Sequence, residues 1–123
     1  MSATSKRESP GRRKPGPTPP HHRVYVIELA PQALASRRMQ VANPDHRPDR
    51  PALYVGQTGH TPEERFQKHR SGVKANAFVR DHGVRLRPDL YEHLPAFPWP
   101  QSLVEEKRLA EALRAQGYAV WSR

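Results

Sequence analysis

Two short apolar runs mark the first strands of this chain. Residues 23–29 read Arg-Val-Tyr-Val-Ile-Glu-Leu, and residues 52–56 read Ala-Leu-Tyr-Val-Gly. Runs of this length that are rich in β-branched and aromatic residues favour β-strands. Side chains alternate across a strand, so Tyr25, Ile27 and Leu29 are expected to share one face.

The rest of the strand pattern is weaker and is interrupted by proline. Residues 84–94 alternate loosely and predict a third strand that breaks at Pro88, while residues 118–121 form a possible final strand. Residues 30–50 carry several prolines and predict a long insertion with a short helix. Residues 95–100 hold three prolines in six positions and predict a rigid, non-helical connector.

The most complete helix signal follows the second strand. Thr61 is a good N-cap, Pro62 suits the first helical position, and Glu64 stands three residues after the cap. These residues predict a helix to about residue 71. Two more helices are expected, over residues 74–82 and over residues 102–116, each ended by a glycine.

Composition separates the beginning of the chain from the rest. Residues 1–20 hold five prolines and five basic residues against one acid, a net charge of +4. A segment that is this poor in apolar residues cannot bury enough surface to offset backbone ordering. We therefore expect a disordered basic tail over residues 1–21 and one small domain over residues 22–123.

Charge indicates the class of partner. The 123 residues carry a formal net charge of +9 and have a pI near 10.6, which favours a nucleic acid over other ligands. The chain has no cysteine, which excludes disulfides, thiolate nucleophiles and cysteine-ligated zinc. It has no apolar run long enough for a membrane span or a signal peptide, so a cytoplasmic protein is expected.

The last predicted helix places a carboxylate on its apolar face. At about 100° per residue, Leu103, Leu109, Ala110 and Leu113 fall in one arc, and Glu106 lies inside that arc. An unpartnered buried carboxylate is costly, so this residue needs a cation, a metal ion or a wet cleft. The alternative is that the helix rolls slightly and leaves it at a solvated border.

A second candidate pair lies on the helix that begins near Pro62. Arg65 and His69 are four residues apart and therefore share one helix face. Arginine offers a fixed fork of donors to a phosphate, and histidine can hold a proton near neutral pH. A solvated basic face is the alternative for this pair.

Taken in order, these polar positions resemble the pattern of the GIY-YIG nuclease superfamily. That pattern places a tyrosine on one strand, a tyrosine and a glycine on the next, an arginine on a helix and a glutamate on a later helix. The resemblance covers residues 23–116. The corresponding residues of this chain are Tyr25, Tyr54, Arg65, His69 and Glu106.

The resemblance implies a fold and a reaction. The fold would be a small α/β (α+β) domain with a central antiparallel sheet of three strands flanked by helices. The reaction would be hydrolysis of a phosphodiester, with DNA as the expected substrate and one Mg²⁺ or Mn²⁺ held by Glu106. Magnesium often binds through one or two carboxylates plus waters and phosphate, and Arg65 would stabilise charge on the phosphoryl oxygens. Tyr25, Tyr54 and His69 all remain candidates for the general base.

The chain also departs from the pattern. Arg23-Val24-Tyr25 lacks the glycine of the first motif, Gln57 stands where several members have lysine, and the connector between the first two strands is long. These departures keep a second function open, a non-catalytic basic module that binds nucleic acid with the same fold. A small structural protein, whose charge only confers solubility, is the third alternative.

Overall fold

The computed structural model describes residues 20–72 and 76–122. Its strands are β1 (Arg23–Leu29), β2 (Ala52–Thr58), β3 (Gly83–Leu86) and β4 (Ala119–Ser122). Its α-helices are α1 (Arg37–Ala42), α2 (Pro62–Arg70), α3 (Ala77–His82) and α4 (Trp99–Ala115). Two short 3-10 helices, Pro31–Ala35 and Pro88–Leu90, complete the described elements.

The sheet has four strands in the order β3-β1-β2-β4. β1 pairs with β2 and with β3 in antiparallel fashion, whereas β4 runs parallel to β2. The α+β class is therefore confirmed, but a sheet of three antiparallel strands is wrong in detail. The strands β3, β1 and β2 match that expectation, and the chain adds a fourth, parallel strand after the last helix.

A buried asparagine explains why so short a fourth strand is held in place. Asn43, which ends α1, accepts a hydrogen bond from the Val120 backbone N–H at 2.8 Å and donates to the Val120 carbonyl at 3.0 Å. One amide side chain thus takes the place of a neighbouring strand at the outer edge of β4. Arg114 of α4 donates to the same Asn43 oxygen and to the same carbonyl.

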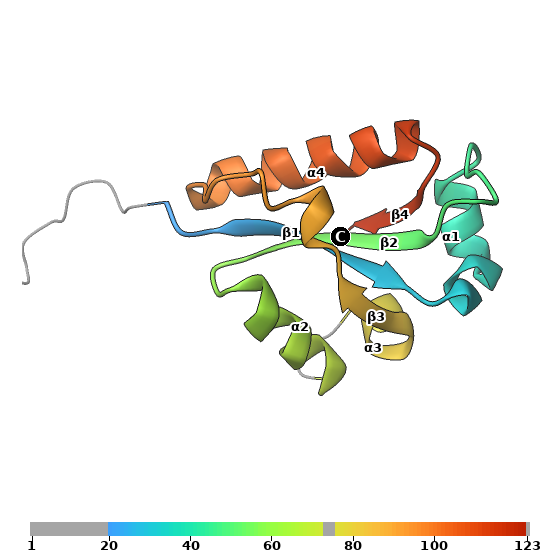
Figure 1. The fold of residues 1–123 in the computed structure, drawn as a ribbon, viewed down its shortest axis with the longest axis horizontal. Helices are drawn as coiled ribbons and strands as arrows, with labels where there is room; N and C mark the ends of the chain where they lie inside the picture. The colour runs from blue at the N-terminus through green and yellow to red at the C-terminus, as the bar shows by residue number, and fades with distance from the viewer. Residues whose placement is uncertain (1–19, 73–75, 123) are drawn as a thin grey trace, which may run out of the picture.

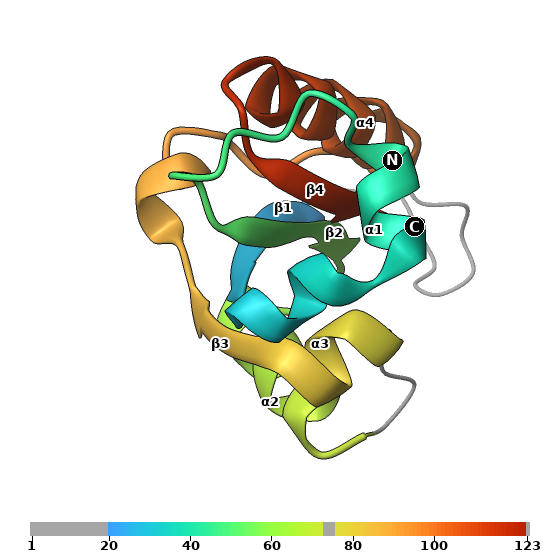
Figure 2. The same cartoon turned by 90° about the vertical axis from the view of Figure 1, so that its right-hand side faces the viewer.

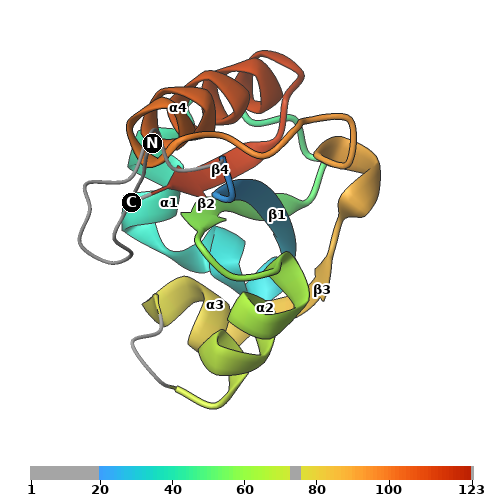
Figure 3. The same ribbon diagram turned by 90° about the vertical axis from the view of Figure 1, so that its left-hand side faces the viewer.

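Helices cover both faces of the sheet (Figures 1 and 2). The long helix α4 lies against β1, β2 and β4 on one face, and α2 and α3 lie against β1 and β3 on the other. The helix α1 packs beside β4. Figure 3 shows the same three layers from the end at which β1 begins.

Because both faces are covered, the central strands are buried on both sides. Tyr25, Ile27 and Leu29 share a face, as predicted, and are at most 1% exposed. Their neighbours Val24 and Val26, on the opposite face, are equally buried. The core therefore has two halves, one on each side of the sheet.

The helix ends follow the local signals, with one exception. The capping box at Thr61 and Glu64 is present in full, and α2 begins at Pro62. The connector over residues 95–100 is shorter than predicted, because α4 already begins at Trp99. Pro100 is tolerated there because the first turn of a helix has no internal acceptor for the missing N–H.

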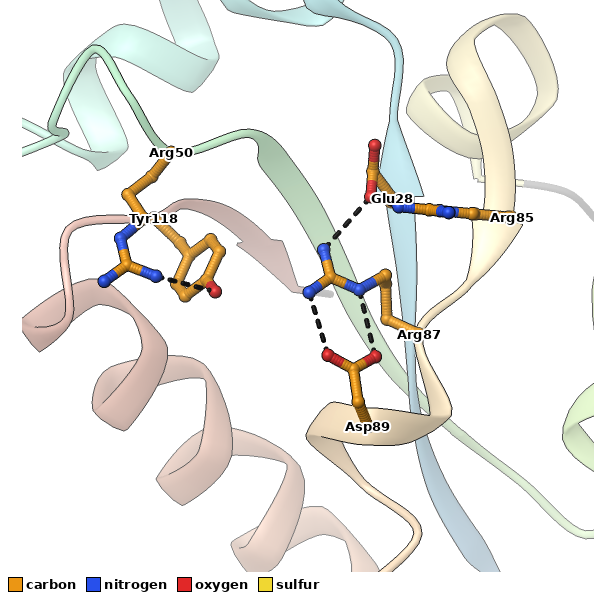
Figure 4. Close-up of polar contacts among 6 residues, drawn as sticks. All are labelled: Glu28, Arg50, Arg85, Arg87, Asp89 and Tyr118. Atoms are coloured by element: carbon orange, nitrogen blue, oxygen red, sulfur yellow. Dashed lines mark hydrogen bonds and ion pairs between the residues drawn. The ribbon is translucent and has the colours of Figure 1, made fainter.

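Two arginines fasten the loops to the sheet (Figure 4). Arg87, just after β3, forms ion pairs with Glu28 of β1 at 3.0 Å and with Asp89 at 2.9 Å. Arg50, just before β2, donates to the Tyr118 hydroxyl at 3.0 Å. Both contacts fix residues that directly precede or follow a strand.

Nearly all of the predicted tail, residues 1–19, lies outside the described residues. The first two residues of the helix predicted over 74–82 also lie outside them. Within the described ranges, no helix combines the length and the apolar character needed to cross a bilayer.

Candidate active site

The candidate site lies at the end of the sheet where β1 begins and β2 ends. β3 pairs only with Ile27–Leu29, and β4 pairs only with Ala52–Val55. Among the named strands, only β1 and β2 therefore continue to the level of Tyr25 and its partner Gly56. Side chains from helices on both faces can approach the same group where the sheet is this narrow.

Tyr25 lies at the centre of the site. Its hydroxyl is 3.0 Å from Nε2 of His69 on α2, and its ring centroid is 6.3 Å from that of Tyr54. Tyr54 in turn packs edge-on against the His69 ring at 5.6 Å. Gly56 makes this possible, because a Cβ there would lie 2.7 Å from the Tyr25 hydroxyl oxygen.

The two remaining predicted residues also act on Tyr25. Arg65, one turn before His69 on α2, hydrogen-bonds to the Tyr25 side chain, and the charge of Glu106 on α4 reaches the same hydroxyl. All five predicted site residues are therefore brought together. They come from two strands and two helices, and the helices lie on opposite faces of the sheet.

The second nitrogen of His69 sets its tautomer. The backbone N–H of Asn76 donates to Nδ1 of His69 at 3.3 Å. In the neutral ring the proton then belongs on Nε2, which donates to the Tyr25 oxygen. The Tyr25 oxygen thus receives hydrogen bonds from both His69 and Arg65.

Burial keeps both groups neutral. The pKa of Tyr25 is raised well above its ordinary value by burial and by the neighbouring Tyr54 and Glu106, and Arg65 offsets this only in part. The pKa of His69 is lowered to about 4, chiefly by burial and secondarily by the Arg65 charge. Arg65 lowers the pKa of Tyr25, but burial outweighs this effect and the phenol stays protonated.

Burial also decides between the two alternatives for Glu106. This residue is 4% exposed and lies on the inner face of α4 in line with Ser102 and Ala110. A solvated border position is thus wrong, and the helical-wheel argument is correct. Tyr25, Tyr54 and His69 are 0–1% exposed. Arg65 alone of the five is half-buried and reaches the surface.

A second polar group, which sequence reasoning missed, ties the site to the rest of the fold. The Gln57 side-chain oxygen accepts a hydrogen bond from Nδ1 of His22 at 3.0 Å and lies 3.4 Å from the Ser102 hydroxyl. Ser102 is fully buried one helical turn before Glu106. The four-residue spacing between Ser102 and Glu106, which places both on one face of the helix, was the sequence signal that could have identified Ser102. Asn76 was also missed, although its role as the N-cap of α3 is a common one.

The carboxylate oxygens of the site fit one hard divalent cation, such as Mg²⁺ or Mn²⁺, that prefers oxygen ligands. Glu106 provides a buried carboxylate whose charge acts on Tyr25, and magnesium accepts one protein carboxylate when waters and a substrate phosphate complete its shell. The described residues contain no group of three or more histidine, aspartate or glutamate side chains that could hold a metal ion by themselves.

A hollow of about 620 Å³ lies beside the cluster, between the start of β1 and the start of α2. Val24, Glu64 and Tyr91 are among its lining residues, and none of the five cluster residues lines it. It adjoins the site through the sequence neighbours of Tyr25 and Arg65.

Comparison with protein-family models, with curated proteins and with solved structures gives no match for this chain.

Proposed function

We propose that this protein is a metal-dependent endonuclease that hydrolyses phosphodiester bonds in DNA. The observation that carries the proposal is that His69 and Arg65 of α2 hydrogen-bond to one phenol oxygen, on which the charge of Glu106 of α4 also acts. A structural core has no need to bury that combination, because each polar group costs free energy to desolvate. The net charge of +9 favours a polyanionic substrate.

Arg65 is the first contact of the substrate phosphate. It is the one member of the cluster that reaches the surface, and its guanidinium carries a fixed fork of donors suited to phosphoryl oxygens. As negative charge develops on those oxygens, an arginine held in place by its neighbours stabilises it without reorganising. In the structure, the Arg65 side chain hydrogen-bonds to Tyr25.

Tyr25 is the better candidate for the general base. His69 directs its proton at the Tyr25 oxygen because Asn76 occupies its other nitrogen. In that tautomer His69 cannot take a proton from Tyr25, but it can stabilise the phenolate. Tyr25 would accept the proton of the attacking water, and His69 and Arg65 would hold the resulting charge.

The raised pKa of Tyr25 sets a condition on this role. While Tyr25 is buried as in the structure, its phenol is protonated and unable to accept a proton. It becomes a base when the negative charge of Glu106 is balanced and when the site opens to water, because these changes remove two of the causes of the raised pKa. A Mg²⁺ or Mn²⁺ held by Glu106 would supply that balancing charge and polarise the phosphate.

One observation favours the second candidate, a nucleic-acid-binding module without activity. Tyr25, Tyr54 and His69 are almost completely buried, as they would be if the cluster only stabilised the fold. Binding would then rest on exposed arginines alone. The two candidates differ in one respect that can be measured, since only the first requires Glu106 to carry a charge.

The test is an incubation of the full chain with duplex, branched and single-stranded DNA and with RNA, in Mg²⁺, in Mn²⁺ and with a chelator. We expect cleavage of a DNA substrate that requires the metal. Glu106→Gln keeps the shape of the side chain and removes its charge, so cleavage should be lost while binding persists or tightens.

Glu111→Gln is the matched control, because Glu111 lies on the exposed face of the same helix. It should cleave like the wild type. If no DNA or RNA is cleaved under any of these conditions, the nuclease proposal is wrong, and binding without cleavage identifies the binding module. If a folded Glu106→Gln variant cleaves fully, the proposed chemistry is wrong.

A further inference from the structure

We propose that Trp121 and Arg38 form a stacking platform for a nucleobase of the bound strand, next to the candidate active site. The proposal deepens the proposed function and rests on it, because the platform would hold a base that flanks the phosphate presented to Tyr25. It concerns a surface that the chemistry described above does not use.

The register of the sheet places Trp121 beside the catalytic cluster. Trp121 of β4 pairs with Tyr54 of β2, which pairs with Ile27 of β1. Paired residues of neighbouring strands share a face and lie about 4.8 Å apart along the sheet. Trp121 is thus one strand away from Tyr54, on the face that carries Tyr25, and Figure 2 shows α1 beside β4.

The Trp121 ring is only partly covered. One part of it packs on Phe78 of α3, with ring centroids 5.2 Å apart. The Arg38 guanidinium carbon lies 5.0 Å from the Trp121 centroid and 5.9 Å from the Phe78 centroid. A guanidinium stacked on an indole presents a flat, cationic surface, on which a base can stack in turn.

Charge and shape at this surface fit a nucleic acid strand. A hollow of about 400 Å³ is lined by Arg37, Arg38, Val41, Ala42 and Trp121. Both arginines are exposed, and within the described ranges neither has an ion-pair partner. α1 contains no acidic residue. An apolar ring next to uncompensated positive charge is the combination that stacks a base and holds its phosphate.

Fluorescence can report on this platform directly. The chain has two tryptophans, so Trp99→Phe leaves Trp121 as the only indole. This variant is titrated, in the presence of a chelator to prevent cleavage, with a single-stranded thymidine decamer and with an abasic decamer of the same phosphate count. We expect quenching of Trp121 by the decamer with bases, and binding at least about fivefold tighter than that of the abasic strand.

Arg38→Gln should remove most of that difference without unfolding the protein, because Arg38 is exposed. Arg80→Gln is the matched control. It removes one exposed arginine, which is paired with Asp81 on α3, and it should weaken both strands equally. Trp121→Leu should abolish the preference as well, and the measured quantity is the ratio of the affinities for the two strands.

Equal affinity and equal fluorescence for the two strands would overturn the platform. A fluorescence change that depends on protein concentration alone would also overturn it, since a second copy of the chain would then cover the surface. Cleavage of DNA by the wild type is measured in parallel with Mg²⁺. Cleavage without a base preference rejects only the platform, whereas a base preference without cleavage rejects only the nuclease.

Discussion

At the scale of single residues, the proposed hydrolysis depends on how the protein holds Tyr25. The phenol oxygen receives hydrogen bonds from His69 and Arg65, and it lies within reach of the charge of Glu106. Each of these side chains alone has an ordinary structural explanation. Their convergence gives them a shared chemistry, because the charge of Arg65 acts on the protonation of both Tyr25 and His69.

His69 should make the stability of the protein depend on pH. Its pKa is about 4 in the folded state and about 6.5 in an unfolded chain. Protonation therefore favours unfolding. The contribution of the neutral ring is complete above about pH 6.5 and is lost as the pH falls to 4, by up to about 3 kcal/mol.

The measurement is the free energy of unfolding in urea from pH 7.5 to pH 4, for the wild type and for His69→Gln. The variant should be less stable at pH 7.5 but should lose less stability on acidification, because it cannot titrate at this position. Parallel curves would show that His69 is not held in the neutral form by burial.

At the scale of elements, α2 is the most important piece, because it carries both Arg65 and His69. Thr61→Ala removes the cap at its start and should lower the free energy of unfolding by about 1 kcal/mol. Thr61→Ser keeps the hydroxyl and should cost less. Urea denaturation of the three proteins checks the order. A Thr61→Ala variant as stable as the wild type would mean that the cap does not hold α2.

The elements also show what could be read from the sequence. The bounds of β1 and the start of α2 were predicted correctly, because β-branched residues and a capping box act within a few positions. The burial of Glu106 followed from helical spacing alone. In each case the physical cause lies within one turn or one strand.

Other features depend on contacts between distant parts of the chain. The parallel pairing of β4 relies on Asn43, which is 77 positions away from Val120, and no local pattern marks such a partner. The tautomer of His69 depends on a backbone N–H of Asn76. The raised pKa of Tyr25 reflects burial between elements that are distant in the sequence, and this burial outweighs the charge of Arg65.

At the scale of the whole molecule, net charge should govern the encounter with nucleic acid. Residues 1–20 contribute +4 of the total of +9. Their deletion should weaken binding and flatten the dependence of log K on log salt, because fewer counterions are released. Fluorescence anisotropy of a labelled duplex at several salt concentrations measures the slope. An unchanged slope would reject a role for the tail in binding.

The central claim is that the Tyr25 oxygen takes part in hydrolysis, and Tyr25→Phe tests it most directly. The variant removes one oxygen and keeps the ring. Tyr91→Phe, which alters a buried tyrosine outside the cluster, is the control. Single-turnover cleavage with Mg²⁺ should fall by about 100-fold or more for Tyr25→Phe, with DNA affinity unchanged and with Tyr91→Phe near the wild-type rate. Cleavage at the wild-type rate by folded Tyr25→Phe would contradict the account.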